Sequence, residues 1–234
     1  NIDEFKLLVS KCVNLECVNS EGMQIIHYAC KNNNLELVKY LVKKGVDINC
    51  TDNYGRRPIH YSCERGDRAL ELVKYLVENG VDVNCADVVH VYPIHHACDS
   101  GALELVKYLV DNGADVNCVN RYGRQPIHFA CNNGDKAIEL VKYLIENGAD
   151  VNYADNYDQQ PIHHACHNNY KSDLFTPVIQ KAITLAGLPS LDDLHKAESN
   201  PSANPKMREQ LMALRVVAEH CRATSLGGAD GALP

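Results

Sequence analysis

The chain has 234 residues and a formal net charge of −7, which fits one elongated domain or a domain with an appendage. This acidic balance disfavours nucleic acid and anionic membranes as partners, although local basic spots remain possible. No apolar run approaches the roughly 18 residues needed to cross a bilayer, so we expect a soluble chain. The first residues form no secretory leader and lack an initiator methionine, so we expect a piece of a longer protein.

A short motif centred on a histidine recurs along the chain with spacings of 33, 35, 33 and 35 residues. Self-similarity at such a period is typical of stacked repeat proteins. The longer spacings arise because residues 66–69 and 134–137 carry two residues more than the matching turns of the other copies. We number the copies one to five by their histidines, which are His27, His60, His95, His128 and His163.

Each copy predicts two helices followed by a polar loop. A proline opens the first helix of copies two to five, where its missing N–H group costs nothing. In the second helix, apolar residues at i, i+2, i+3, i+5 and i+6 predict burial on more than one side. This helix is expected to begin at Leu35, Leu70, Leu103 and Ile138 and to be stopped by Gly45, Gly80, Gly113 and Gly148.

Residues 4–17 match only the second helix and the loop of such a unit, with Cys12 where the glycine usually stands. We therefore expect the series to begin in the middle of a unit.

Cysteine is abundant, with 11 copies, and most of them recur at two fixed positions of the motif. Cysteines that recur with a structural repeat are most simply small, buried apolar residues. We therefore expect reduced thiols and a cytoplasmic, intracellular protein rather than a disulfide framework. One position holds Cys30, Cys63, Cys98, Cys131 and Cys166, and the other holds Cys17, Cys50, Cys85 and Cys118.

The pattern resembles the ankyrin repeat over about residues 1–170, with a proline-histidine helix and the segment Gly113-Ala114-Asp115-Val116-Asn117 closing the second helix. The resemblance implies an all-α fold, an ankyrin-repeat solenoid of stacked helix-turn-helix units with protruding loops. It would contain a truncated half repeat, four full repeats and one first helix. The family threonine before the proline is replaced, for example by Arg57 and Tyr92, which puts its usual hydroxyl link to the repeat histidine in question.

The resemblance implies a scaffold or adaptor that binds a partner protein through its concave face and loop tips, as a monomer without cofactor, nucleic acid or membrane. Candidate partner-binding residues follow from the matching positions of copies two to five. They are Asn53, Tyr54, Arg56, Glu64 and Arg65, then Val88, Val89, Val91, Asp99 and Ser100, then Arg121, Tyr122, Arg124, Asn132 and Asn133, and finally Asn156, Tyr157, Gln159, His167 and Asn168.

A tyrosine recurs at one loop position, as Tyr54, Tyr122 and Tyr157, and the first two stand near Arg56 and Arg124. Tyrosine and arginine are the residues that most often anchor protein interfaces. The alternative is that this tyrosine braces neighbouring loops.

The third loop departs from the others, because Val88, Val89, His90 and Val91 replace a turn that contains glycine. Without glycine we expect the loop to lose its residue of positive φ. An apolar patch at a loop tip suggests a partner contact. Neutral drift, or a loop folded onto its neighbours, is the alternative.

Histidine and cysteine recur at positions i and i+3 of the first helices, a spacing that can place two metal ligands on one helix face. The histidine is the repeat histidine and the cysteine takes a buried alanine position, so we expect no metal site. No copy stands out as a Cys–His nucleophilic pair, and no phosphate loop or HExxH motif is present. We therefore expect no enzyme.

The repeat ends near Tyr170, and the sequence beyond it is rich in alanine and leucine. We predict a helical cap or junction over residues 171–199 with helices at 177–185 and 191–197, a linker at 200–205, and an amphipathic helix within 206–234 that ends near Cys221. Three interpretations stay open: a cap on the solenoid, a helix that docks into a partner, or a segment of another protein. The tail could thus carry a recruitment or signalling activity that the repeats only target.

Overall fold

The structure is a computed structural model that describes residues 14–133, 138–161, 163 and 164. The chain divides into two compact units, Asn1–Arg121 and Tyr122–Pro234, and each is described by itself. The helices expected beyond Tyr170, most of the half repeat at residues 4–17 and the inserted turn at 134–137 lie outside the described residues.

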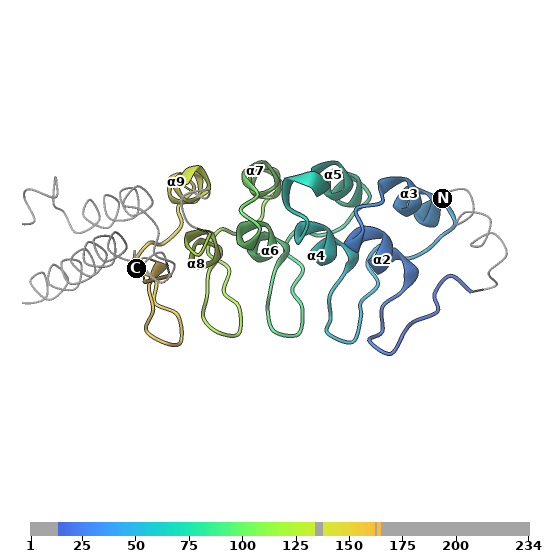
Figure 1. The fold of residues 1–234 in the computed structure, drawn as a ribbon, viewed down its shortest axis with the longest axis horizontal. Coiled ribbons are helices and arrows are strands. Elements are labelled where there is room, and N and C mark those ends of the chain that lie inside the picture. Colours follow the sequence, from blue (N-terminus) through green and yellow to red (C-terminus); the bar gives the residue numbers. More distant parts are fainter. Residues whose placement is uncertain (1–13, 134–137, 162, 165–234) are drawn as a thin grey trace, which may run out of the picture. The chain divides into compact units, whose positions relative to one another are not determined.

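The first unit is built from two rows of helices, with the loops projecting from the first row (Figure 1). Within this unit each helix of the first row packs against the second-row helix of its own copy, and α2, α4 and α6 pack against one another in sequence order. The first row, called the inner helices, holds α2 (Ile25–Lys31), α4 (Pro58–Cys63) and α6 (Pro93–Asp99). The second row, called the outer helices, holds α3 (Leu35–Lys43), α5 (Leu70–Glu78) and α7 (Leu103–Asp111).

The helix starts agree with the sequence signals. The outer helices begin at Leu35, Leu70 and Leu103, and α4 and α6 begin at their prolines. Proline is favoured at the first helical position because the N–H group it lacks has no partner inside the helix. The sequence prediction of paired helices is therefore confirmed for this unit.

The outer helices end at glycines that adopt a left-handed conformation, with φ of 85° at Gly45 and 89° at Gly80. No atom lies within 4 Å of the position that a Cβ would take at either glycine. The glycine is therefore required by the backbone angle and not by crowding, because only glycine adopts this angle without steric cost.

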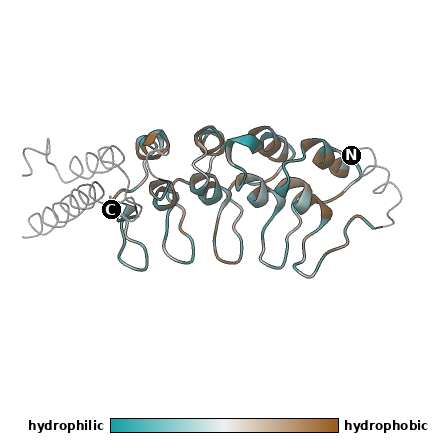
Figure 2. Cartoon of the chain, in the orientation of Figure 1, coloured by the Kyte–Doolittle hydropathy of each residue, from teal (hydrophilic) through white to brown (hydrophobic). Residues whose placement is uncertain are grey.

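The core of the first unit lies between the two rows of helices. Ile26, Ile59 and Ile94 have no exposed surface, and neither has the recurring cysteine of the inner helices, such as Cys63. Each such side chain contributes roughly 1.5–3 kcal/mol by leaving water. The predicted role as a buried apolar residue is confirmed for this cysteine and for Cys85 at the second recurring position, but it is wrong for Cys17, which is exposed. In Figure 2 the loop before α6 is more apolar than the loop before α4.

The two additional residues of copy two form a turn of 3-10 helix, η1 (Gly66–Ala69), between α4 and α5. Ala69 is fully buried, and η1 contacts both α5 and α7. The carboxylate of Asp67 accepts a hydrogen bond from the backbone N–H of Leu105 at 2.9 Å. The insertion therefore strengthens the contact between neighbouring copies.

The second unit repeats the same plan in its described part. It contains the inner helix α8 (Pro126–Cys131), which packs against the outer helix α9 (Ile138–Glu146), and helical backbone resumes at Pro161. Across the described stretches of both units, no helix combines the length and the apolar character needed to cross a membrane.

Candidate functional site

The loops that precede the inner helices share one internal support, an aspartate or asparagine at their first position, which is exposed at Asn19 and buried at Asp52, Asp87, Asn120 and Asp155. We name these segments loop 1 (residues 19–24), loop 2 (52–57), loop 3 (87–92), loop 4 (120–125) and loop 5 (155–160). In loop 2, Oδ1 of Asp52 accepts the backbone N–H groups of Tyr54 and Arg56 at 2.8 and 2.9 Å. Asp87 and Asp155 make the same pair of contacts in loops 3 and 5. The carboxylate therefore fixes the backbone of each of these loops.

Neighbouring loops are joined by backbone hydrogen bonds, which we call the loop ladder. The N–H group of a loop's second residue donates to the carbonyl of the third residue of the loop before it. The N–H of Val88 donates to Tyr54 at 3.0 Å, and that of Arg121 donates to Val89 at 2.9 Å. Asn53 donates to Glu21 in the same way, and Asn156 donates to Tyr122 within the second unit. The loop tips are thus held in place before any partner binds.

The expectation that loop 3 loses its residue of positive φ is wrong. His90 has a φ of 58°, close to the 72° of Gly55 at the same position of loop 2. The contacts that Asp87 and the loop ladder make impose this backbone, and histidine tolerates the left-handed region better than most side chains. Loop 3 therefore keeps the shape of the other loops although its side chains differ.

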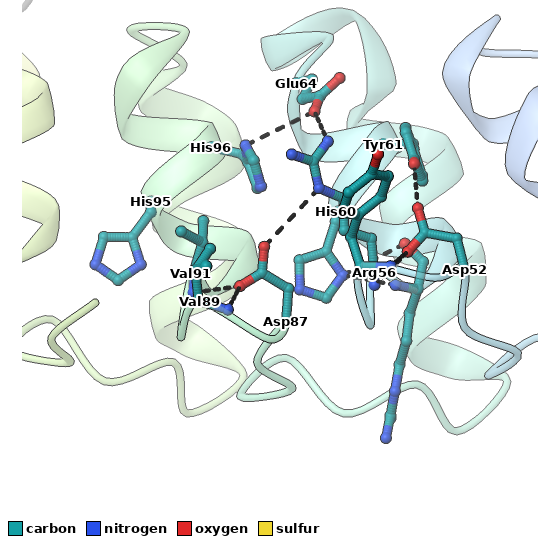
Figure 3. A network of polar contacts seen from close by, with 12 residues as sticks. Asp52, Arg56, His60, Tyr61, Glu64, Asp87, Val89, Val91, His95 and His96 are labelled. Atoms are coloured by element: carbon teal, nitrogen blue, oxygen red, sulfur yellow. Dashed lines mark hydrogen bonds and ion pairs between the residues drawn. The ribbon is translucent and has the colours of Figure 1, made fainter. Parts of the chain in front are cut away.

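The second oxygen of each buried aspartate meets a donor from another element (Figure 3). Oδ2 of Asp87 lies 3.8 Å from Nε of Arg56, and that of Asp155 lies 3.0 Å from Nε of Arg124. Oδ2 of Asp52 accepts the hydroxyl of Tyr61. The side chains of both arginines are only about one third exposed, at 34% and 33%. They therefore support the neighbouring loop and are not presented freely to a partner.

The arginine–aspartate pairs sit beside histidines of the inner helices. Glu64 lies 3.4 Å from Arg56 and 3.9 Å from Nδ1 of His96. Burial, helped by the charges of His60 and Arg56, lowers the pKa of His96 to about 3. In loop 5, burial acts to raise the pKa of Asp155, but the Arg124 side chain and backbone N–H groups outweigh it and hold the pKa at about 2. At neutral pH His96 is therefore neutral and Asp155 is ionised.

The repeat histidine ties its helix to the next loop. Its Nδ1 accepts the N–H group of the residue before the proline, at 3.0 Å for His60 and Arg57. Its Nε2 faces a carbonyl of the following segment, at 3.2 Å between His27 and Arg56. The backbone N–H of the residue before the helix thus links to the repeat histidine although no threonine stands there.

The thiols of Cys30, Cys63 and Cys131 on the inner helices are not activated as nucleophiles. Burial raises the pKa of the Cys30 and Cys131 thiols to about 12, and that of Cys63 well above its ordinary value, so each stays protonated. All cysteines within the described ranges are free thiols. Within those same ranges, no group of three histidine, cysteine or acidic side chains is arranged to hold a metal ion.

The predicted binding residues fall into two groups. Those with half-buried side chains are Arg56, Val89, Val91, Arg124, Asn133 and Gln159. Those that are exposed are Asn53, Tyr54, Glu64, Arg65, Val88, Asp99, Ser100, Arg121, Tyr122, Asn132, Asn156 and Tyr157. His167 and Asn168 lie outside the described residues. The exposed group forms the accessible part of the candidate surface.

Tyr54 and Val88 form an exposed apolar pair at the tips of loops 2 and 3. Their side chains are 52% and 61% exposed, and their backbones are joined by the loop ladder. Tyr122 and Tyr157 are also large exposed residues, at 46% and 62%. The backbone joins the loops, so the alternative that the tyrosine rings brace them is not needed to explain how the loops are held.

Sequence reasoning missed two sets of residues. It passed over the loop aspartates, although their recurrence at positions 52, 87 and 155 is a visible signal. It also passed over Lys31, which is exposed at the end of α2 and matches Glu64, Asp99 and Asn132 of the later copies. The candidates were drawn from copies two to five only, and this choice excluded Lys31.

Comparison with known proteins gives two results. A family model of ankyrin repeats, made of three copies, matches residues 1–87 and 94–176. A segment of 66 residues, 28% of this chain, is 46% identical to alanine--tRNA ligase of Bdellovibrio bacteriovorus, and a segment of the same length is 46% identical to that of Magnetococcus marinus. The match spans 7% and 6% of the length of these two proteins.

Proposed function

Because the chain belongs to the ankyrin-repeat family, whose members are generally protein-binding modules and typically non-catalytic, we propose that it is a scaffold or adaptor for a partner protein. The partner contacts the tips of loops 2 to 5 and the exposed ends of the inner helices. Fold alone does not carry function, so the proposal depends on what these surfaces present.

One observation carries the proposal: the loop tips are fixed in place while their outermost side chains stay exposed. The buried aspartates and the loop ladder fix the backbone, so binding does not have to order it. Fixing a loop before binding removes much of the entropy cost of association. Tyr54 and Val88 then supply an aromatic ring and an apolar group at adjacent tips, which suits an interface anchor.

The test replaces this pair, as Tyr54→Ala with Val88→Ala, in the full chain. We expect proteins captured by the unchanged chain to bind the double variant at least about fivefold more weakly, because truncation of an interface anchor costs more than about 1 kcal/mol. Titration calorimetry with the captured partner measures the change. Thermal unfolding followed by circular dichroism checks that the variant still folds.

The matched control removes the exposed ion pair of α5, as Glu71→Ala with Lys74→Ala. This pair lies on an outer helix with 2.8 Å between its charged atoms, and loss of an exposed pair costs little stability. Unchanged affinity in the Tyr54 and Val88 variant, or an equal loss in the control, would contradict the assignment of the loop tips.

The second candidate places a recruitment or signalling activity in residues 171–234. Its support is the amino-acid composition, because all 12 tyrosines stand at or before Tyr170 and the later sequence is rich in alanine and leucine. The likeness to the two alanine--tRNA ligases covers too little of those enzymes to bring their activity to this chain. Removing residues 171–234 tests the idea: kept partner binding with a lost downstream effect supports it, and lost folding supports a cap.

We further propose a monomer in the reducing cytoplasm. The described cysteines are free thiols, and those of the inner helices are packed in the core as apolar residues. The net charge of −7 argues against nucleic acid or an anionic membrane as the main partner.

A further inference from the structure

Three cations gather at the ends of the inner helices in the first unit. Lys31 ends α2, Arg65 follows α4, and Arg68 lies in η1, and all three are exposed. The Arg65 side chain donates from Nε to the carbonyl of Lys31, and the side chain of Asn33 donates to the carbonyl of Arg68 at 2.8 Å. These bonds join the end of α2 to the segment that carries Arg65 and Arg68. We name them the basic patch.

The basic patch is not neutralised within the described part of the chain, where none of its three side chains forms an ion pair. The acidic residues nearest in sequence are Glu64 and Asp67. Glu64 lies 3.4 Å from Arg56, and Asp67 accepts the N–H group of Leu105. The ammonium of Lys31 lies 5.9 Å from the centre of the Tyr61 ring, which is an uncharged contact. A positive surface therefore persists on a chain with a net charge of −7.

At the positions of Lys31 and Arg65 the positive charge occurs only in the first two copies, whereas Lys136 of copy four matches Arg68 in the sequence. The position of Lys31 is taken by Glu64, Asp99 and Asn132 in copies two to four, and that of Arg65 by Ser100 in copy three. The exposed ends of the inner helices thus change from basic to acidic within the first unit. A partner segment is therefore oriented by charge on this face.

We propose that the basic patch binds an extended segment of the partner that carries aspartate or glutamate side chains. The proposal rests on the proposed function and names the chemistry of the partner. Complementary charge of this kind adds mainly to the rate and the specificity of association.

The three cations lie on different segments, at the end of α2, after α4 and in η1, which favours several carboxylates over one phosphate. An extended chain advances about 3.3 Å per residue, so acidic side chains a few residues apart can reach separate cations. A phosphate site would instead bring arginine forks together on one group. Here the Nε of Arg65 is already used by the Lys31 carbonyl.

The experiment measures binding of a fluorescein-labelled peptide of about 12 residues, four repeats of Glu-Gly-Ser, to the full chain by fluorescence anisotropy. We expect binding at low ionic strength that weakens as salt is added, because exposed charges are screened. The triple variant Lys31→Gln, Arg65→Gln and Arg68→Gln should bind about fivefold more weakly or worse. Circular dichroism verifies its folding.

The matched control is Lys39→Gln, Lys43→Gln and Lys44→Gln, which removes the same charge from exposed positions of α3 and its end. Unchanged affinity in this control supports the proposal. An equal loss in both triple variants, or no binding by the unchanged chain, overturns it. So does a clear preference for the same peptide with phosphoserine in place of glutamate, which would indicate a phosphate site.

The outcome is separable from that of the proposed function. If the peptide fails to bind while the Tyr54 and Val88 variant loses its captured partner, the basic patch is wrong and the scaffold function stands. If the peptide binds through the basic patch while the loop variant keeps its partner, the assignment of the loop tips fails.

Discussion

Two junctions between neighbouring loops show opposite chemistry on the same backbone. Between loops 2 and 3, Arg56 reaches the buried carboxylate of Asp87, and His96 lies beside them. At the matching positions between loops 3 and 4, valine (Val91) replaces the arginine and asparagine (Asn120) replaces the aspartate. Asn120 is as buried as Asp87, with 6% of its surface exposed. Where the cation is lost, the carboxylate is lost as well.

This difference shows that the buried residue of a loop depends on the side chain that faces it from the loop before. A buried carboxylate is costly unless a charge or several donors compensate it, whereas an amide caps the same turn without a charge. A third position also becomes apolar at the neutral junction. Phe129 of copy four stands where Tyr61, His96 and His164 stand in copies two, three and five. Of these two junctions, one is therefore charged and matched and the other is neutral.

The largest effect is expected from placing a carboxylate in the neutral junction. Asn120→Asp should lower the free energy of unfolding by about 3 kcal/mol, because the new charge is buried without a cation. Adding Val91→Arg should restore about 2 kcal/mol. Urea denaturation of the two single variants and the double variant gives the coupling. If the effects of the two substitutions on the free energy of unfolding are simply additive, the two positions are not coupled, and the contrast between charged and neutral junctions is wrong.

The next largest effect is expected from acid, which should lower the free energy of unfolding through the charged junction between loops 2 and 3. Burial holds the pKa of His96 at about 3, against an ordinary value of 6.5, so below about pH 6.5 the unfolded chain binds a proton that the folded chain does not. Stability therefore falls as the pH falls from about 6.5 towards 3. His96→Phe, which copies Phe129, should reduce the loss between about pH 7.5 and 4.5 by on the order of 2 kcal/mol.

Urea unfolding of both chains at the two pH values measures this difference. An unchanged pH dependence in His96→Phe would show that other groups cause the acid sensitivity, since burial also lowers the pKa of His128 to about 4.

Removing the cation alone should have a smaller effect. Arg56→Leu leaves Asp87 without its guanidinium, but the arginine side chain is one third exposed, so we expect a loss of about 1 kcal/mol. Adding Asp87→Asn reproduces the neutral junction and should recover part of that loss. Thermal unfolding of the single and double variants is sufficient, and a further drop in the double variant would contradict charge matching.

The smallest effect concerns the backbone that both junctions share. His90→Gly should raise the free energy of unfolding by about 0.5 kcal/mol, because glycine adopts positive φ without strain. Gly55→Ala should lower it by about 1 kcal/mol, since its Cβ would lie 3.1 Å from the backbone nitrogen of Val88. Equal and negligible shifts in both variants would show that the loops do not require this angle.

Sequence reasoning located the elements well and the side-chain roles less well. The helix starts at Leu35 and Pro58 follow from signals within a few residues, and such local signals are visible in the amino-acid sequence. The role of Arg56 depends on Asp87, 31 positions later and in another copy, which no local pattern indicates. The angle of His90 was missed for a similar reason, because the loop ladder and Asp87 impose it from outside the residue.

The loop ladder also has an evolutionary consequence. Each N–H group must find the carbonyl of one particular residue in the loop before it, so a residue inserted into a loop would put the bonds of that loop to its neighbours out of register. The interval from Gly45 to Pro58 accordingly recurs unchanged from Gly80 to Pro93, while the longer spacings are absorbed between the helices at η1. New binding specificities in this chain are therefore reached by exchanging side chains on a frame of constant length, and not by lengthening the loops.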